Sequence, residues 1–158
     1  MVIGQLVSPV QATLFYKSEL YTIMEVGSQL QTNRVNSNMN VIVIDDDVDV
    51  RDLFVELLQM SKINILGIGS NGKDALELYK LHNPDIVFID YIMPQYDGLY
   101  GAEKIKEFDP HAKIVLVSGS YIEKGRLDTL VSAILKKPIE INDVISTINN
   151  VACAMNIK

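Results

Sequence analysis

Acidic side chains follow two of the apolar runs in this sequence, at the point where each run ends. Asp45 and Asp46 come directly after residues 41–44, and Asp90 comes directly after residues 86–89. If these ends meet, Asp46 beside Asp90 is unfavourable, because two like charges about 4 Å apart at a protein surface repel by about 4 kcal/mol. Magnesium would remove that penalty: it prefers oxygen ligands and usually takes one or two carboxylates, which leaves sites for water and a phosphoryl oxygen. The acidic residues therefore predict a site for Mg²⁺ or Mn²⁺.

A hydroxyl and an ammonium group follow two further apolar runs. Ser118 comes directly after residues 114–117, and Lys137 comes shortly after residues 133–135. A lysine supplies a point positive charge and a serine a hydroxyl donor, and both suit the oxygens of a transferring phosphoryl group. Because no histidine or cysteine stands at these ends, a carboxylate is the expected acceptor. Asp90, at the end of the third and central run, is the most plausible one.

The elements that must position these side chains can be read from the apolar pattern after residue 39. Short runs rich in β-branched residues predict strands, and apolar residues at helical spacing predict helices. The predicted strands are residues 41–44, 63–68, 86–89, 114–117 and 133–135. The predicted helices have as their apolar faces Val50, Leu53, Phe54, Leu57 and Leu58; Ala75, Leu76 and Tyr79; Leu99, Ala102, Ile105 and Phe108; a short stretch at 121–130; and Ile141, Val144, Ile145, Ile148, Val151, Ala152 and Met155.

Five near-continuously apolar strands alternating with five helices predict an α/β fold. The strands would form a parallel sheet that is covered by helices on both faces, in a doubly wound arrangement. In such sheets functional groups gather beyond the carboxyl ends of the strands, where the strand order reverses. Asp47 or Asp49 and Asn71 are expected to cap the first two helices.

The sequence resembles the receiver domain of bacterial and archaeal response regulators. The resemblance spans residues 39–158 and depends on five spaced motifs. They are VIVIDDDVDVR at 41–51, NGKDAL at 71–76, PDIVFIDYIMPQYDG at 84–98, KIVLVSG at 113–119 and KKP at 136–138. It implies a flavodoxin-like fold of strand order 2-1-3-4-5. It also implies a signalling domain rather than an enzyme, which takes a phosphoryl group from a histidine kinase or phosphotransfer protein and switches a surface that binds an unidentified downstream protein.

The resemblance also implies a role for each site residue. Asp90 would be the phosphoacceptor, Ser118 the switch hydroxyl and Lys137 the phosphate-sensing lysine. The metal ligands would be Asp45, Asp46, Asp90 and the backbone carbonyl of Tyr91, and Ile92 and Ser120 would tune the lifetime of the phosphoryl group. Ile92 offers no hydrogen bond to an attacking water, so slow hydrolysis is expected.

The sequence departs from the family pattern in two places. Ile134 stands where the family usually has an aromatic residue, and an isoleucine cannot make the hydrogen bond of a flipping ring. The segment between Ser118 and Lys137 is a few residues short, so the helix within it is expected to be trimmed. No output domain follows Lys158, so a stand-alone, chemotaxis-type receiver is expected if the N-terminal extension is not an output domain.

Three rival interpretations each fit part of the pattern. An EF-hand calcium loop would use Asp45, Asp47, Asp49 and Glu56, but Val50 occupies the position that needs glycine, and the preceding segment is a predicted strand. A haloacid-dehalogenase phosphatase is the enzymatic alternative, yet it needs Thr or Val where Asp49 stands and a further acidic pair after the lysine. A plain flavodoxin-like binding module would rest only on the short Ser-Gly-Ser stretch at 118–120.

Charge and composition exclude other classes. The net charge is −6 and the isoelectric point about 4.8, which argues against direct DNA binding. One cysteine forbids an internal disulfide, no apolar run reaches the roughly 18 residues of a membrane span, and no signal peptide is recognisable, so a cytoplasmic protein is expected. Residues 1–38 are read as an N-terminal extension with a polar linker at 29–40, or as residues upstream of a biological start at Met39, and residues 39–158 as the receiver domain.

Overall fold

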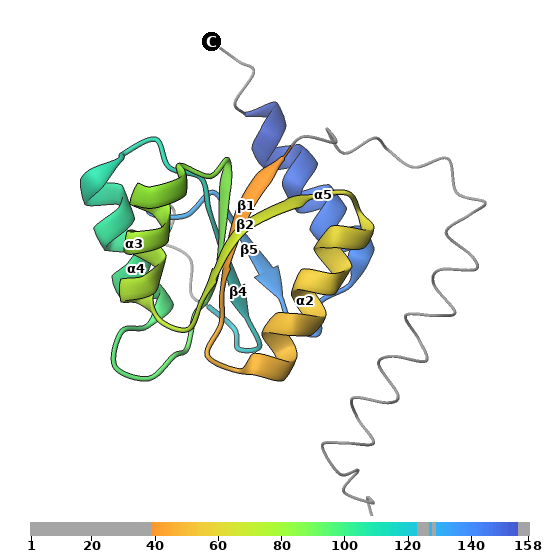
Figure 1. The fold of residues 1–158 in the computed structure, drawn as a ribbon, viewed down its shortest axis with the longest axis horizontal. Coiled ribbons are helices and arrows are strands. Elements are labelled where there is room, and N and C mark those ends of the chain that lie inside the picture. The colour runs from red at the N-terminus through yellow and green to blue at the C-terminus, as the bar shows by residue number, and fades with distance from the viewer. Residues whose placement is uncertain (1–38, 123–126, 128, 155–158) are drawn as a thin grey trace, which may run out of the picture. The chain divides into compact units, whose positions relative to one another are not determined.

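The computed structural model describes residues 39–122, 127 and 129–154, and these form one sheet between two layers of helices (Figure 1). The strands are β1 (Asn40–Ile44), β2 (Asn64–Gly69), β3 (Ile86–Asp90), β4 (Ile114–Ser118) and β5 (Ala133–Lys136). They are parallel and lie in the order β2-β1-β3-β4-β5. The helices are α2 (Val48–Met60), α3 (Gly72–His82), α4 (Gly98–Phe108) and α5 (Ile141–Cys153), with α3 and α4 on one face of the sheet and α2 and α5 on the other. The predicted fold class and strand order are confirmed.

The three central strands are buried on both faces, as a parallel sheet between helices requires. Every residue of β3 and β4 is buried, and so is every residue of β1 after Asn40. Phe88 is fully buried in β3, and its ring meets that of Phe54 from α2 edge to face, with 5.2 Å between centroids. These strands therefore hold their carboxyl ends at fixed positions along one edge of the sheet.

Side-chain caps start the first two helices where the sequence predicted them. Asp47 accepts hydrogen bonds from the backbone N–H groups of Asp49 and Val50, and Asn71 accepts them from Lys73 and Asp74. Each cap satisfies N–H groups that have no partner within the helix. Since Asp47 is used as the cap, the chain turns into α2 two residues after Asp45 and leaves that carboxylate at the end of β1.

One expectation about the helices is wrong, and another falls partly on residues that the structure does not describe. Phe108, expected on the buried face of α4, is 58% exposed. Its ring contacts that of Tyr79 edge to face at 6.3 Å and lies 5.1 Å from the Lys80 ammonium, so it covers the outside of the α3–α4 pair. Of the short helix expected at 121–130, residues 123–126 and 128 lie outside the described residues, and the rest form turns or irregular backbone. Met155 also lies outside them.

None of the helices in the described part of the chain is long and apolar enough to cross a membrane.

Candidate functional site

The carboxyl edge of the sheet brings together the side chains that the sequence predicted there. Asp45 follows β1, Asp90 ends β3, Ser118 ends β4 and Lys137 follows β5. Three of these polar residues are buried: Asp45 is 6% exposed, Asp90 6% and Ser118 2%. Buried polar side chains are costly unless they are paired, so their concentration at one edge points to a site rather than to packing.

Three carboxylates form a compact acidic cluster. One oxygen each of Asp45, Asp46 and Asp90 lies within 4.8 Å of the others. Asp46 is exposed whereas Asp45 and Asp90 are buried, so solvent reaches the cluster beside Asp46. One oxygen of Asp45 also accepts a hydrogen bond of 2.9 Å from the backbone N–H of Asp47, which fixes that carboxylate on the turn into α2. The geometry offers oxygen ligands of the kind that Mg²⁺ prefers.

Lys137 is the cation that balances the two buried carboxylates. Its Nζ lies 2.6 Å from Oδ1 of Asp90 and 2.9 Å from Oδ2 of Asp45. Burial lowers the pKa of this ammonium. The hydrogen bonds to Asp90 and Asp45 and the charges of these two carboxylates raise it by more, so the pKa lies above the ordinary lysine value. Burial raises the pKa of Asp90, and Lys137 offsets only part of that effect. Lys137 therefore stays charged, and its positive charge favours the ionised form of the buried Asp90 side chain.

The turn after β3 holds the other Asp90 oxygen. Oδ2 accepts a 2.9 Å hydrogen bond from the backbone N–H of Ile92, a residue that is 64% exposed. The Tyr91 carbonyl accepts a 3.1 Å hydrogen bond from the Gly98 N–H, which closes the turn. Gly98 is required there, because a Cβ at this position would overlap the Asp90 carbonyl. The sequence reasoning gave Gly98 no role of its own, although Asp97-Gly98 ahead of an apolar stripe is a recognisable turn signal.

Ser118 is engaged with its own loop. Its hydroxyl donates to the carbonyl of Ser120 at 3.2 Å and accepts from the Ser120 N–H at 3.1 Å. Ser120 itself is exposed. Among the described residues the hydroxyl binds local backbone alone, so it can turn to another acceptor without leaving a buried charge unpaired. Ile134, on β5, packs partly buried against the core on the α3–α4 face of the sheet.

Comparisons with known proteins identify the family of the chain. Residues 41–149 match the family model of the response regulator receiver domain. The chain is 32% identical over 118 residues to the chemotaxis protein CheY of Halobacterium salinarum, an alignment that covers 72% of this chain and 97% of that protein. It is 28% identical over 112 residues to the CheY of Bacillus subtilis, covering 69% of this chain and 93% of that protein.

Solved structures give the same result. The CheX–CheY–BeF3–Mg²⁺ complex from Borrelia burgdorferi contains a chain with a TM-score of 0.67 at 27% identity, covering 76% of this chain and 90% of that one. The receiver domain of the NarL response regulator from Mycobacterium tuberculosis has a TM-score of 0.66 at 27% identity, covering 75% and 98%. None of these comparisons supports a haloacid-dehalogenase phosphatase. The chain belongs to the response regulator receiver domain family of two-component signalling systems.

Proposed function

We propose that Asp90 accepts a phosphoryl group from a histidine kinase or a phosphotransfer protein, and that Mg²⁺ bound at the acidic cluster is required. The observation that carries this proposal is the surroundings of Asp90. It is a buried carboxylate at the end of the central strand, 2.6 Å from the Lys137 ammonium and within 4.8 Å of Asp45 and Asp46. A nucleophile, a cation and a set of metal ligands thus meet at one point.

The acidic cluster fits a hard divalent cation. Lys137 supplies one positive charge against three carboxylates, and a divalent ion would make up the difference. Asp45, Asp46 and Asp90 would hold the ion through oxygens. The ion would neutralise charge on the phosphoryl oxygens during transfer.

A backbone carbonyl of the turn would complete the protein ligands. The sequence names that of Tyr91, which already accepts the Gly98 N–H at 3.1 Å. It would therefore bind the ion through its second lone pair, or the next carbonyl of the turn, that of Ile92, would take its place. Both carbonyls belong to the turn that follows Asp90, so the count of protein ligands is the same in either case.

In the transfer step, a carboxylate oxygen of Asp90 attacks the phosphorus of the donor. The bond from phosphorus to the donor's nitrogen or oxygen breaks as the acyl phosphate forms. Lys137 would then move from the Asp90 oxygen to a phosphoryl oxygen and keep its contact with Asp45. The Ser118 hydroxyl would exchange the Ser120 carbonyl for another phosphoryl oxygen. These two exchanges would couple phosphorylation to the loops after β4 and β5, and so to a downstream protein.

Incubation with acetyl phosphate tests the proposal. With Mg²⁺, intact-mass spectrometry should find one added phosphoryl group per chain, and chelation of the metal should abolish it. Asp90→Asn should not be labelled. Asp97→Asn is the matched control, because Asp97 is an exposed carboxylate that caps α4 at the end of the same turn. Wild-type labelling of Asp90→Asn would refute the assignment, and turnover of a chromogenic phosphoester would favour a phosphatase.

We further propose that residues 39–158 are an autonomous receiver and that the protein acts in the cytoplasm. Met39 is buried, and its carbonyl accepts a 2.9 Å hydrogen bond from the Asn64 N–H. Met39 is therefore part of the packed and hydrogen-bonded domain. A chain that begins at Met39 should melt within about a degree of the full chain and accept a phosphoryl group equally well. A loss of several degrees would contradict autonomy.

A further inference from the structure

In the described part of the chain, one edge of the sheet has no neighbouring strand and carries no charge. β2 is the edge strand on the β1 side, and its six residues, NILGIG, include neither a charged residue nor a proline. The opposite edge strand, β5, has four residues and ends in the exposed Lys136. Edge strands are normally protected by charges, proline or short length, because their free backbone groups pair readily with another chain. Of the two edges, only β2 lacks such a charge.

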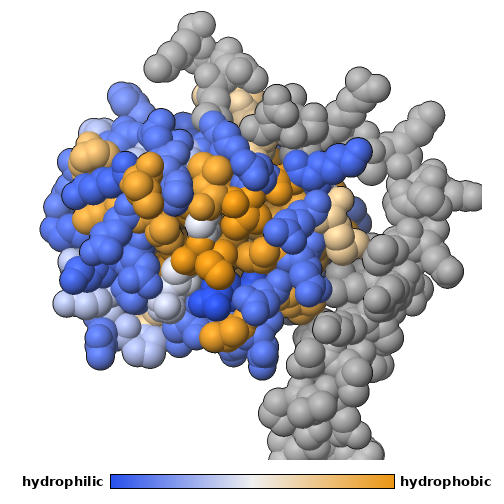
Figure 2. Space-filling view, in the orientation of Figure 1, coloured by the Kyte–Doolittle hydropathy of each residue, from blue (hydrophilic) through white to orange (hydrophobic). Residues whose placement is uncertain are grey.

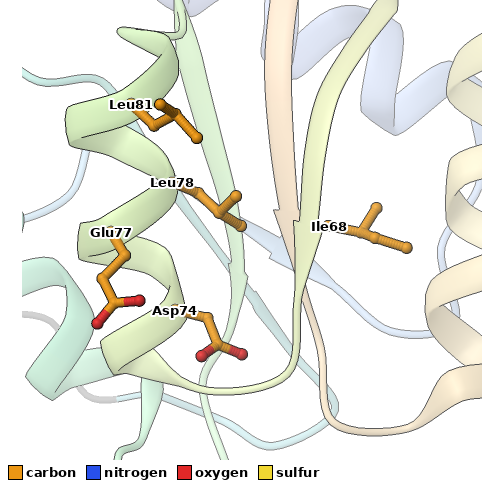
Figure 3. Close-up of a pocket in the computed structure, with 5 residues that line it drawn as sticks. All are labelled: Ile68, Asp74, Glu77, Leu78 and Leu81. Atoms are coloured by element: carbon orange, nitrogen blue, oxygen red, sulfur yellow. The ribbon is translucent and has the colours of Figure 1, made fainter.

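Apolar side chains flank this edge. Figure 2 shows an apolar patch near the centre of the face that Figure 1 presents, where β2 lies in front. Ile68 on β2 is 48% exposed and Leu81 on α3 is 74% exposed. A hollow of about 280 Å³ is lined by Ile68, Asp74, Glu77, Leu78 and Leu81 (Figure 3). A contiguous exposed apolar surface of this kind commonly marks an interaction site.

Backbone hydrogen bonds show which residues face outward. The Asn64 N–H donates to the Met39 carbonyl at 2.9 Å, and the Gly69 carbonyl accepts from the Asp45 N–H at 3.2 Å. Both residues therefore direct their backbone groups toward the β1 side. Because successive residues of a strand alternate, Ile65 and Ile68 direct theirs to the open side. The register shift between Val41 and Ile42, which leaves Leu66 unpaired, explains why these outward residues are three apart instead of two.

We propose that this edge pairs with β2 of a second copy of the chain, antiparallel about a two-fold axis perpendicular to the sheet. In the register that pairs Ile65 with Ile68 of the second copy, symmetry also pairs Ile68 with Ile65, so the outward backbone groups of both copies meet. The bulge does not disturb this match, because both copies carry it. The result is one continuous sheet of two receiver domains, an isologous interface of the kind that most soluble dimers use.

The side chains on both faces suit that pairing. On the α3 face, β2 presents Gly67 and Gly69, whose positions are covered by Leu78: a Cβ on Gly67 would lie 2.9 Å from a Leu78 methyl group. In Figure 3, Leu78 points from α3 toward β2, whereas Ile68 points away from α3. Pairing would thus bring Ile65 and Ile68 of the two copies together on the α2 face. On the α3 face, Leu78 and Leu81 of one copy would approach Leu78 and Leu81 of the other copy, beside Gly67 and Gly69 of both strands.

Charges at the two ends of β2 favour a second copy over another occupant. The exposed Lys62 precedes the strand, and Asp74 and Glu77 lie at its other end, where Asp74 accepts the Ser70 N–H at 2.9 Å. An antiparallel two-fold places Lys62 of each copy beside the acidic end of the other. The net charge of −6 opposes association over longer distances, but at about 0.15 M salt the screening length is roughly 8 Å and the local pairs dominate.

Sedimentation velocity of the full chain, from micromolar to submillimolar concentration at physiological salt, tests the proposal. The wild type should show a reversible monomer–dimer equilibrium. Ile68→Lys places a charge in the paired edge and should weaken dimerisation by more than about tenfold. Tyr121→Lys is the control, because Tyr121 is 92% exposed and lies beyond β4, away from β2. It should dimerise as the wild type does.

A charge exchange separates this interface from any other dimer. Lys62→Glu should weaken dimerisation, and adding Glu77→Lys should restore it. Hydrogen exchange gives a readout that needs no variant: the amides of Ile65 and Ile68 should become protected as the concentration rises. A monomeric wild type over the whole range, a dimer that Ile68→Lys leaves intact, or unchanged exchange at these amides would each overturn the proposal. None of these results bears on phosphoryl transfer at Asp90.

Discussion

Nζ of Lys137 lies 2.6 Å from Oδ1 of Asp90, so the cation after β5 is held against the carboxylate that ends β3. The contact joins residues on strands that are not neighbours, because β4 lies between them. Lys137 also bonds Asp45 at 2.9 Å. It therefore acts as the internal counter-ion of the site before any metal or phosphoryl group binds.

Removing that counter-ion should destabilise the metal-free protein. We expect Lys137→Gln to lower the free energy of unfolding in EDTA by about 1.5–3 kcal/mol, the usual range for a hydrogen bond to a charged group that leaves its partner buried. Chemical denaturation with urea measures this. Lys136→Gln, a change of the same charge at the exposed neighbour, should have an effect of less than about 0.5 kcal/mol. Equal effects for the two variants would mean that the buried carboxylates do not depend on Lys137.

Asp46→Ala should raise the melting temperature without metal and reduce the stabilisation by Mg²⁺. Asp46 lies within 4.8 Å of Asp45 and Asp90, so its removal relieves repulsion, and we expect a rise of about 2–5 °C. The same change removes a proposed ligand, and an ion stabilises a protein only in proportion to its binding to the native state. Melting curves with and without Mg²⁺ test both effects.

Glu56→Ala is the control for net charge, since Glu56 is exposed on α2 and outside the acidic cluster. It should leave the gain from Mg²⁺ unchanged. If Asp46→Ala melts lower without metal and still gains fully from Mg²⁺, Asp46 is neither crowded nor a ligand.

Ile92→Asn should shorten the lifetime of the phosphorylated protein. Ile92 donates its N–H to Asp90 and exposes 64% of its residue surface at the mouth of the site, but its side chain cannot orient a water. An amide at this position can, and we expect faster decay after removal of the phosphodonor, followed by intact mass. Leu81→Asn makes the same kind of change far from Asp90, on α3, and should decay as the wild type does. Unchanged or slower decay in Ile92→Asn would count against this role.

The hydroxyl of Tyr79 donates a 2.6 Å hydrogen bond to Asp109, which ties α3 to the end of α4. This bond, with that from the His111 N–H, lowers the pKa of Asp109. A carboxylate whose pKa is lowered on folding stabilises the folded protein at pH values above the ordinary aspartate pKa of about 3.9. That stabilisation is lost as the pH falls through the pKa of Asp109 in the folded protein. Tyr79→Phe should cost about 0.5–1.5 kcal/mol near neutral pH.

The difference between wild type and Tyr79→Phe should shrink as the pH falls below about 4, because protonated Asp109 is a weaker acceptor. Urea denaturation over that range measures it. Tyr121→Phe, at an exposed position, should show no difference at any pH. A Tyr79→Phe effect that stays constant down to the lowest accessible pH would show that the Asp109 charge does not contribute.

The apolar pattern was sufficient to predict the parallel sheet and the convergence of the site, and the resemblance to receiver domains supplied the order of the strands. Apolar periodicity located β1 and β3 within one residue, and a parallel sheet necessarily gathers Asp45 and Asp90 at one edge. Contacts between residues that only the folded chain brings together could not be predicted from the sequence. Periodicity assigned Phe108 to the core, but the ring lies outside against Tyr79. The bulge at Leu66, which sets the outward residues of β2, follows from pairing with β1 and has no local signal.

The most direct test is to locate the phosphoryl group on the chain. The full chain would be loaded with acetyl phosphate and Mg²⁺, the acyl phosphate reduced with borohydride, which converts a phosphorylated aspartate into homoserine, and the peptides sequenced by tandem mass spectrometry. We expect homoserine at residue 90 alone, and none when EDTA replaces Mg²⁺. Homoserine at residue 45, 46 or 97 with Asp90 unmodified, or loading that persists in EDTA, would contradict the assignment of Asp90 as the metal-dependent phosphoacceptor.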